Sequence, residues 1–240
     1  GGTVMVIGKS GGNEVHGTLF EFLRNEDLNA RNYFAGAGRK PEFRRNQYGG
    51  TAGGPIRKNK TFYFGAWQGT RLHTGVTRQS VVPTDAQRNG VFTTTIYDPL
   101  TSPRVPFANN TISGSRIDPL AMQVIQHYPL PNASGANNFA RTAVDPDSQD
   151  QFESRLDHVF NDRHRIFGRY SYLRDNDNPV APLPDGSGSL TSGVIGHAIT
   201  RGDGIVSEYA WSLFPSILNQ ARFGYSRRDV NQSALQNGGI

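Results

Sequence analysis

Cysteine is absent from the 240 residues, so the chain can form neither a disulfide framework nor a thiolate metal site. Long hydrophobic runs are absent as well. Only 35% of the residues are apolar, and no stretch approaches the roughly 20 apolar residues of a membrane-spanning helix. If this chain crosses a membrane, we therefore expect it to do so with β-strands.

Runs of like charge are also missing, although the net charge is +5 and the isoelectric point is about 9.6. Basic residues are scattered among acidic ones, as at Glu153, Arg155 and Asp157. Nucleic-acid-binding proteins usually gather their positive charge on one face. We therefore expect no nucleic-acid partner.

No arrangement of catalytic residues is evident, and we expect that the protein is not an enzyme. Glu153 and Asp157 are four residues apart on one strand, which separates them by about 13 Å, more than the carboxylates of glycosidases. His158 and His164 flank a turn near Asp157 and Asp162, but their spacing matches no metal-binding motif. We expect neither a metal nor a cofactor.

Alternation of apolar and polar residues is the strongest pattern that is present. Between 150 and 160, Phe152, Leu156 and Phe160 alternate with charged residues, as in a strand with one apolar face. Similar patterns predict an all-β fold, a partial antiparallel meander of a transmembrane barrel. Its seven strands are expected near residues 14–24, 44–56, 61–82, 150–160, 165–174, 199–213 and 217–230.

The connections between these strands alternate strictly in length. Those at 57–60, 161–164 and 214–216 are short, whereas those at 25–43, 83–148 and 175–197 are long. Short periplasmic turns and long extracellular loops are typical of outer-membrane barrels. The longest loop should contain a short helix, because Asp118 and Pro119 form a helix start before apolar residues at helical spacing. A β-rich surface or secreted glycan-binding module, such as a sandwich, remains the alternative.

Each strand of such a barrel has a lipid face and a lumen face. We expect an aromatic set to face lipid: Phe20, Phe22, Tyr170, Tyr172, Tyr209, Trp211, Phe223 and Tyr225. We expect a charged set to face the lumen: Glu153, Arg155, Asp157, Arg169, Glu208, Arg222 and Arg228. The other interpretation is that the charged set is only the polar face of a half-exposed sheet.

Several sequence blocks also resemble a known family. They are Gly-Gly-Thr-Val at the start, Lys9-Ser10-Gly11 with Asn13, His16-Gly17, Phe22-Leu23-Arg24-Asn25, Arg45-Asn46-Gln47, Gly53-Gly54-Pro55 and Lys60-Thr61-Phe62. In this order they resemble the junction of plug and barrel in TonB-dependent outer-membrane receptors of the Oar-like branch.

The resemblance implies that residues 1–13 end a plug domain and that residues 14–240 begin a barrel of about 22 strands. It implies active transport of an extracellular ligand across the bacterial outer membrane. The implied partners are outer-membrane lipid and the TonB energy-transducing complex, which would act through plug segments upstream of this sequence. Because the chain starts at Gly1 without a methionine, we expect the natural protein to continue on both sides.

Overall fold

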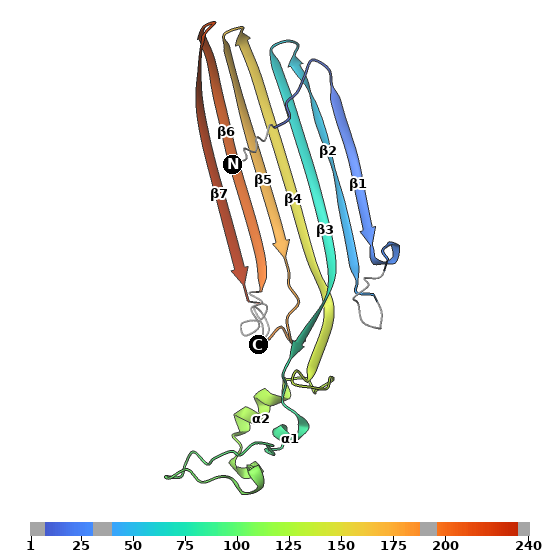
Figure 1. The fold of residues 1–240 in the computed structure, drawn as a ribbon, viewed down its shortest axis with the longest axis vertical. Coiled ribbons are helices and arrows are strands. Elements are labelled where there is room, and N and C mark those ends of the chain that lie inside the picture. The colour runs from blue at the N-terminus through green and yellow to red at the C-terminus, as the bar shows by residue number, and fades with distance from the viewer. Residues whose placement is uncertain (1–7, 31–39, 188–195, 235–240) are drawn as a thin grey trace. The chain divides into compact units, whose positions relative to one another are not determined.

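The structure is a computed structural model that describes residues 8–30, 40–187 and 196–234. Seven strands form one antiparallel sheet in which each strand pairs with the next along the chain (Figure 1). They are β1 (His16–Asn25), β2 (Phe43–Arg57), β3 (Thr61–Ser80), β4 (Phe139–Asn161), β5 (His164–Asp177), β6 (His197–Phe214) and β7 (Ile217–Ser233). The predicted all-β antiparallel meander is confirmed.

The short turns join neighbouring strands at one end of the sheet, and the long connections leave from the other end (Figure 1). In the turn between β2 and β3, the backbone N–H of Lys60 donates to the carbonyl of Arg57 at 3.0 Å. Asn59 takes a φ of 62° there. Asparagine tolerates this left-handed conformation better than most residues, so the turn can be this tight.

The predicted start of the fourth strand was wrong, because β4 begins at Phe139 rather than near residue 150. The third strand ends at Ser80, so the loop between them spans 81–138. Pro146 lies within β4 although proline has no N–H to donate to a neighbouring strand. On the β5 side, the pairing starts at Asp147, and Pro146 contributes only its carbonyl, which accepts from the N–H of Asn178 at 3.2 Å.

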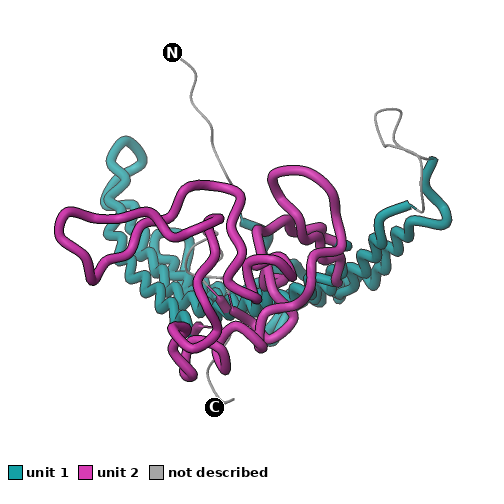
Figure 2. Tube along the Cα trace, turned by 90° about the horizontal axis from the view of Figure 1, so that it is seen from below, with its two compact units in different colours: residues 1–75, 144–179, 197–233 teal, residues 76–143, 180–196, 234–240 magenta. Residues whose placement is uncertain are grey.

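The chain divides into two compact units (Figure 2). Unit 1 contains residues 1–75, 144–179 and 197–233, and seen end-on its strands form an arc. Unit 2 contains residues 76–143, 180–196 and 234–240. Its small core consists of Val82, Phe139 and Leu183, all nearly inaccessible to solvent.

Unit 2 contains two short helices, α1 (Asp85–Arg88) and α2 (Pro119–Gln126). As predicted, Asp118 caps α2, accepting from the N–H of Leu120 at 2.7 Å, and proline is the first helical residue. Arg88 donates to the carbonyl of Ile125, in the last turn of α2, and to that of Tyr128, just beyond it. A cation at a helix C-terminus is favourable because the helix dipole is negative there.

The described part of the chain also contains three single-turn 3₁₀ helices, at Glu26–Leu28, Ala108–Asn110 and Gly114–Arg116. Among the described residues, no helix has the length and hydropathy needed to span a membrane. Of residues 1–13, which were expected to end a plug domain, residues 1–7 lie outside the described residues.

Candidate functional site: the charged face of the sheet

The charged residues singled out in the sequence share one face of the sheet. Residues directly opposite each other on paired strands point to the same side. Arg155 lies opposite Arg169, Phe167 opposite Glu208, and Glu208 opposite Arg222. Because side chains alternate along each strand, the whole set lies on this side: Glu153, Arg155, Asp157, Arg169, Glu208, Arg222 and Arg228. We call it the charged face.

Six of these seven residues form ion pairs. Arg155 donates to Asp157 at 2.7 Å, with only 18% and 20% of the two side chains exposed. Its guanidinium also lies 4.1 Å from the centroid of the Phe167 ring. The other pairs are Glu153 with Arg169 and Glu208 with Arg222. The pairs neutralise each other's charge, so this face is strongly polar with little net charge.

Arg228 is the exception, since the described residues offer it no ion pair. It lies opposite Gly202, and its side chain is exposed. Among these seven residues, Arg228 is thus the one cation without a carboxylate partner in the described part of the chain.

The opposite face, called here the apolar face, carries most of the exposed aromatic and aliphatic residues of the strands. Tyr170 lies opposite Ile205, and Ile205 lies opposite Tyr225. The same alternation assigns to this face Phe152, Leu156, Ile166, Tyr172, Tyr209, Trp211 and Phe223. Six of the eight aromatic residues predicted to face lipid are thus on one side of the sheet.

Phe20 and Phe22 are not on that side, which corrects the sequence prediction. Thr61 on β3 bonds His158 on β4 at 2.9 Å, so odd-numbered residues of β3 share the apolar face. The register of β2 with β3, and then that of β1 with β2, places Leu19 and Glu21 on the apolar face as well. Phe20 and Phe22 therefore lie on the charged face.

The reason for this error is that both sides of β1 contain large apolar residues. Alternation shows that Phe20 and Leu19 point to opposite sides, but it does not show which side is outward. Leu19 is 93% exposed and shares its side with Leu23. The apolar face is thus continued in β1 by leucines.

The apolar face forms a band with polar ends. The rings of His158 and Phe160 are in contact, which places Phe160 on this side, eight residues from Phe152. Eight residues span about 27 Å along a strand, or about 21 Å along the membrane normal at a tilt of about 40°. Beyond Phe152, Arg71 and Asp150 form an ion pair at 3.0 Å. The height agrees with the apolar belt of about 25 Å on outer-membrane barrels.

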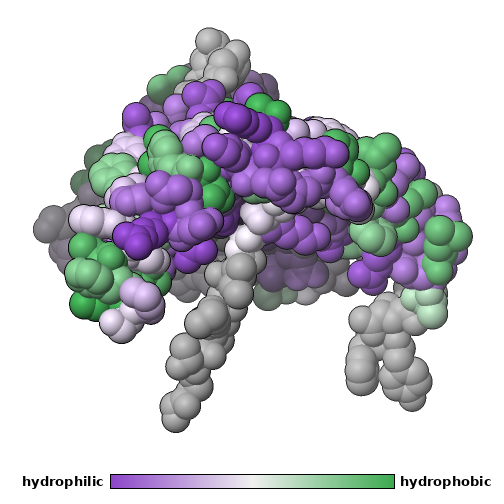
Figure 3. Space-filling model, turned by 90° about the horizontal axis from the view of Figure 1, so that it is seen from above, coloured by the Kyte–Doolittle hydropathy of each residue, from purple (hydrophilic) through white to green (hydrophobic). Residues whose placement is uncertain are grey.

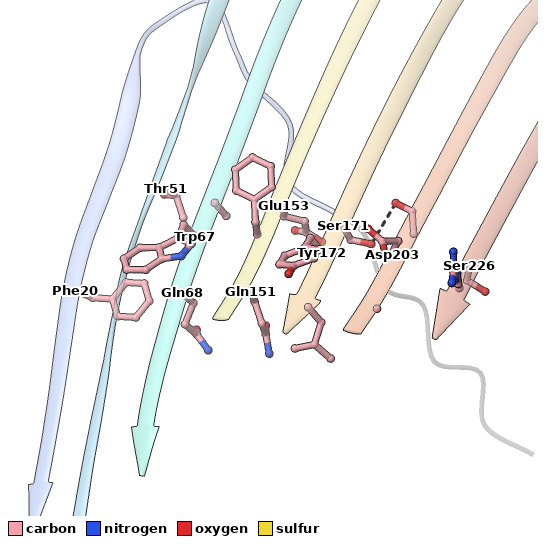
Figure 4. A pocket seen from close by; sticks show the side chains of 16 residues that line it. Phe20, Thr51, Trp67, Gln68, Gln151, Glu153, Ser171, Tyr172, Asp203 and Ser226 are labelled. Atoms are coloured by element: carbon pink, nitrogen blue, oxygen red, sulfur yellow. Dashed lines mark hydrogen bonds between the residues drawn. The ribbon is translucent and has the colours of Figure 1, made fainter. Parts of the chain in front are cut away.

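A depression of about 630 Å³ runs across the strands of unit 1, with lining residues from β1 to β7 (Figure 4). Most of its polar lining belongs to the charged face: Thr51, Gln68, Gln151, Glu153, Ser171 and Ser226. Phe20 closes one end of it. The lining contains two carboxylates, those of Glu153 and Asp203, and it also has large apolar side chains such as Trp67 and Leu173, so it is polar and apolar side by side.

The segment before β1 lies against the charged face. A Cβ added to Gly8 would lie 3.3 Å from a guanidinium nitrogen of Arg169, and one added to Gly11 would lie only 2.2 Å from the carbonyl oxygen of Tyr63. Asn13 then bonds Asn59 twice, each time at 2.7 Å. Figure 1 shows this segment crossing the sheet near the short turns. At Gly11 the backbone lies so close to the strands that only glycine, which has no Cβ, fits there.

Sequence reasoning did not find these contacts. Asn13 and Asn59 are 46 residues apart, and neither stands in a local pattern that points to the other. The same is true of Arg71 and Asp150, which are 79 residues apart. Pairs of this kind become visible only when the strand register is known.

The histidines considered for a metal site have other partners. His158 bonds Thr61, and the Nδ1 atom of His164 lies 2.6 Å from the hydroxyl of Tyr209. No group of three or more His, Asp or Glu residues in the described ranges could hold a metal ion.

The most strongly perturbed carboxyl outside the strands belongs to Asp98, in the loop of unit 2. Hydrogen bonds from the Arg116 guanidinium, at 2.6 and 2.8 Å, are the main reason that the pKa of Asp98 falls from 3.8 to about 2. The N–H of Leu100 also donates to this carboxylate at 3.0 Å. These contacts fix the loop locally and are separate from the charged face.

An apolar band of membrane height on one face and an ion-paired face on the other is the arrangement of a barrel wall. The family model described as "Outer membrane beta barrel domain" matches residues 7–239. The chain belongs to this family. It is thus a β-barrel protein of the bacterial outer membrane. No curated protein and no solved structure matches it.

Proposed function

We propose that the outer-membrane barrel to which this chain contributes is a TonB-dependent receptor that transports a ligand across the outer membrane. The observation that carries the proposal is the segment from Gly8 to Asn13, which lies on the charged face beside the ion pairs of Arg155 and Arg169. A plug inside the barrel must be connected to the first wall strand by a segment that lies on the lumen side, and this segment lies on the charged face. The sequence blocks that resemble the plug and barrel junction give independent support.

In this proposal, the charged face is the lumen wall. Its ion pairs keep the wall polar without a strong net field, so that a hydrated plug can slide or rearrange against it. Salt bridges with partial exposure contribute little stability, about 0 to 1 kcal/mol each, and can exchange partners at low cost. Residues 1–13 are the end of the plug and its linker, and the remainder is wall. The protein is not an enzyme and needs no cofactor.

The long connections contact the extracellular ligand, and the TonB complex acts on plug segments upstream of Gly1. The competing glycan-binding sandwich has less support, because the described residues form one sheet rather than two packed sheets.

The proposal is tested with the full-length protein in planar lipid bilayers. The intact protein should show little conductance, and a variant that lacks everything before residue 14 should form large, stable channels, because the lumen loses its plug. The periplasmic domain of TonB should retain the intact protein and not the shortened one. Equal conductance of the two proteins, or no retention by TonB, would count against the proposal.

A further inference from the structure

The short turns carry cations that have no anionic partner within the protein. Arg57, Lys58 and Lys60 lie in or beside the turn between β2 and β3, and Arg163 lies in the turn between β4 and β5. All four are exposed, and none forms an ion pair with any described residue. The only carboxylate in these two turns is that of Asp162. We call these four residues the turn cations.

Cations at the other boundary of the apolar band are arranged differently. Arg71 is paired with Asp150 at 3.0 Å, and Arg227 lies directly opposite Asp203. At that end, the protein supplies its own anions. At the short-turn end, charge neutralisation must come from outside the described chain.

Aromatic residues place the turn cations at the level of lipid headgroups. The rings of His164 and Trp211 are stacked with their centroids 5.5 Å apart, and His164 bonds Tyr209. Tryptophan and tyrosine prefer the boundary between hydrocarbon and headgroups. Arg57 lies opposite Thr61, which belongs to the apolar face, so its side chain leaves the sheet on the lipid side.

Figure 3 looks onto the short-turn end and shows hydrophilic residues gathered over much of it, with hydrophobic residues among and beside them. This is the mixture expected where a protein passes from hydrocarbon into headgroups. A cation one or two residues beyond the aromatic pair is at phosphate depth, since a strand rises about 3.3 Å per residue.

We propose that the turn cations bind the phosphates of anionic glycerophospholipids in the leaflet that contains the short turns. Each exposed Lys or Arg near an anionic membrane surface is attracted to it, and several close together add their effects. The attraction fixes the depth of the barrel wall on its short-turn side. The proposal depends on the membrane location of the chain and not on the transport that the barrel performs.

The experiment uses the full-length protein in nanodiscs that contain equal amounts of phosphatidylethanolamine and phosphatidylglycerol, followed by native mass spectrometry of the lipids that stay bound. The test variant combines Lys60→Gln with Arg163→Gln. Its matched control combines Arg174→Gln with Arg201→Gln, two exposed cations opposite each other at the long-loop end. Heat-modifiable migration in gels confirms first that each protein is folded.

Wild-type protein and control should retain phosphatidylglycerol in preference to phosphatidylethanolamine, and the test variant should lose this preference by about fivefold for each cation removed. High salt should weaken the preference of the wild type. Equal retention of the two lipids by wild-type protein would overturn the proposal. So would an equal loss of the preference in the control variant.

Discussion

Phe223 and Gly224 are neighbours on β7 that lie on opposite faces of the sheet. Phe223 is 62% exposed on the apolar face, and a Cβ added to Gly224 would meet no atom within 4 Å. An arginine placed in the middle of a lipid-facing band costs about 2 to 4 kcal/mol, whereas one in a hydrated lumen costs little.

We therefore expect Phe223→Arg to lower the free energy of unfolding of the full-length protein by about 2 to 4 kcal/mol. The matched variant Gly224→Arg should change it by less than about 1 kcal/mol. Both are measured by urea unfolding from lipid vesicles. The reverse order of the two effects would mean that the assignment of the faces is inverted.

Asp98 and Arg116 form the second test at the scale of residues. The pKa of Asp98 is lowered from 3.8 to about 2, mainly by hydrogen bonds from Arg116. A carboxyl whose pKa is lower in the folded loop than in the unfolded chain stabilises the folded loop. This stabilisation is complete at pH values above the unfolded pKa. This stabilisation is lost as the pH falls from about 4 through about 2.

Cleavage by pepsin within residues 81–138 should therefore rise between about pH 4 and pH 2, relative to an unstructured peptide that corrects for the activity of pepsin. Asp98→Asn should already show the faster cleavage at about pH 4 and little further change below it. An identical pH profile for both proteins would show that this pair does not stabilise the loop.

At the scale of elements, the alternation of short turns and long connections predicts which end of the strands faces the outside of the cell. Arg104 is exposed in the long loop between β3 and β4, and Lys58 is exposed in the short turn between β2 and β3. Both residues are cleavage sites for trypsin. Because short turns are periplasmic in outer-membrane barrels, only the first should be accessible on intact cells.

Trypsin added to intact cells should cut after Arg104, and cutting after Lys58 should require a permeabilised outer membrane. The sites are identified by mass spectrometry of the fragments. Arg104→Gln provides the control, since it should abolish the first cut without changing the second. Cutting after Lys58 in intact cells would reverse the topology.

The helical part of the long loop shows how local signals and distant contacts cooperate. Asp118 and Pro119 start α2, as their types and order predict. Its C-terminus depends on Arg88, which lies far away in sequence and donates to the carbonyls of Ile125 and Tyr128. The helix was therefore predictable, whereas its attachment to α1 was not.

At the scale of the whole molecule, the sheet of the described residues is open. β1 and β7 each pair with one neighbour only, so each leaves a row of backbone N–H and C=O groups without strand partners. Such edges pair readily with other chains. In a closed barrel they would be joined to further strands.

The 240 residues produced alone should therefore associate, both in water and in detergent micelles, whereas the full-length protein should be a single species in detergent. Sedimentation velocity distinguishes these outcomes. A monomeric product that is soluble in water and unfolds cooperatively would contradict the expected open sheet and favour a self-contained β-rich module.

The sequence by itself determined the seven strands, their antiparallel order, the alternation of short turns and long connections, and the start of α2. These features follow from period-2 alternation, turn residues and helix caps, all of which act over a few neighbouring residues. Alternation along each strand and the short turns also predicted which charged residues share a face within β4 and β5, and within β6 and β7. The step from β5 to β6 crosses a long connection, and there the register of the sheet confirms that all seven share one face.

Only the tertiary structure decided the rest. Phe20 and Phe22 join the charged face because the register across β1, β2 and β3 places them there, and no local pattern distinguishes them from Leu19 and Leu23. The beginning of β4 at Phe139 depends on its pairing with β3, across a loop of 58 residues from 81 to 138. Contacts over such distances depend on the register of the sheet, which the alternation of one strand does not specify.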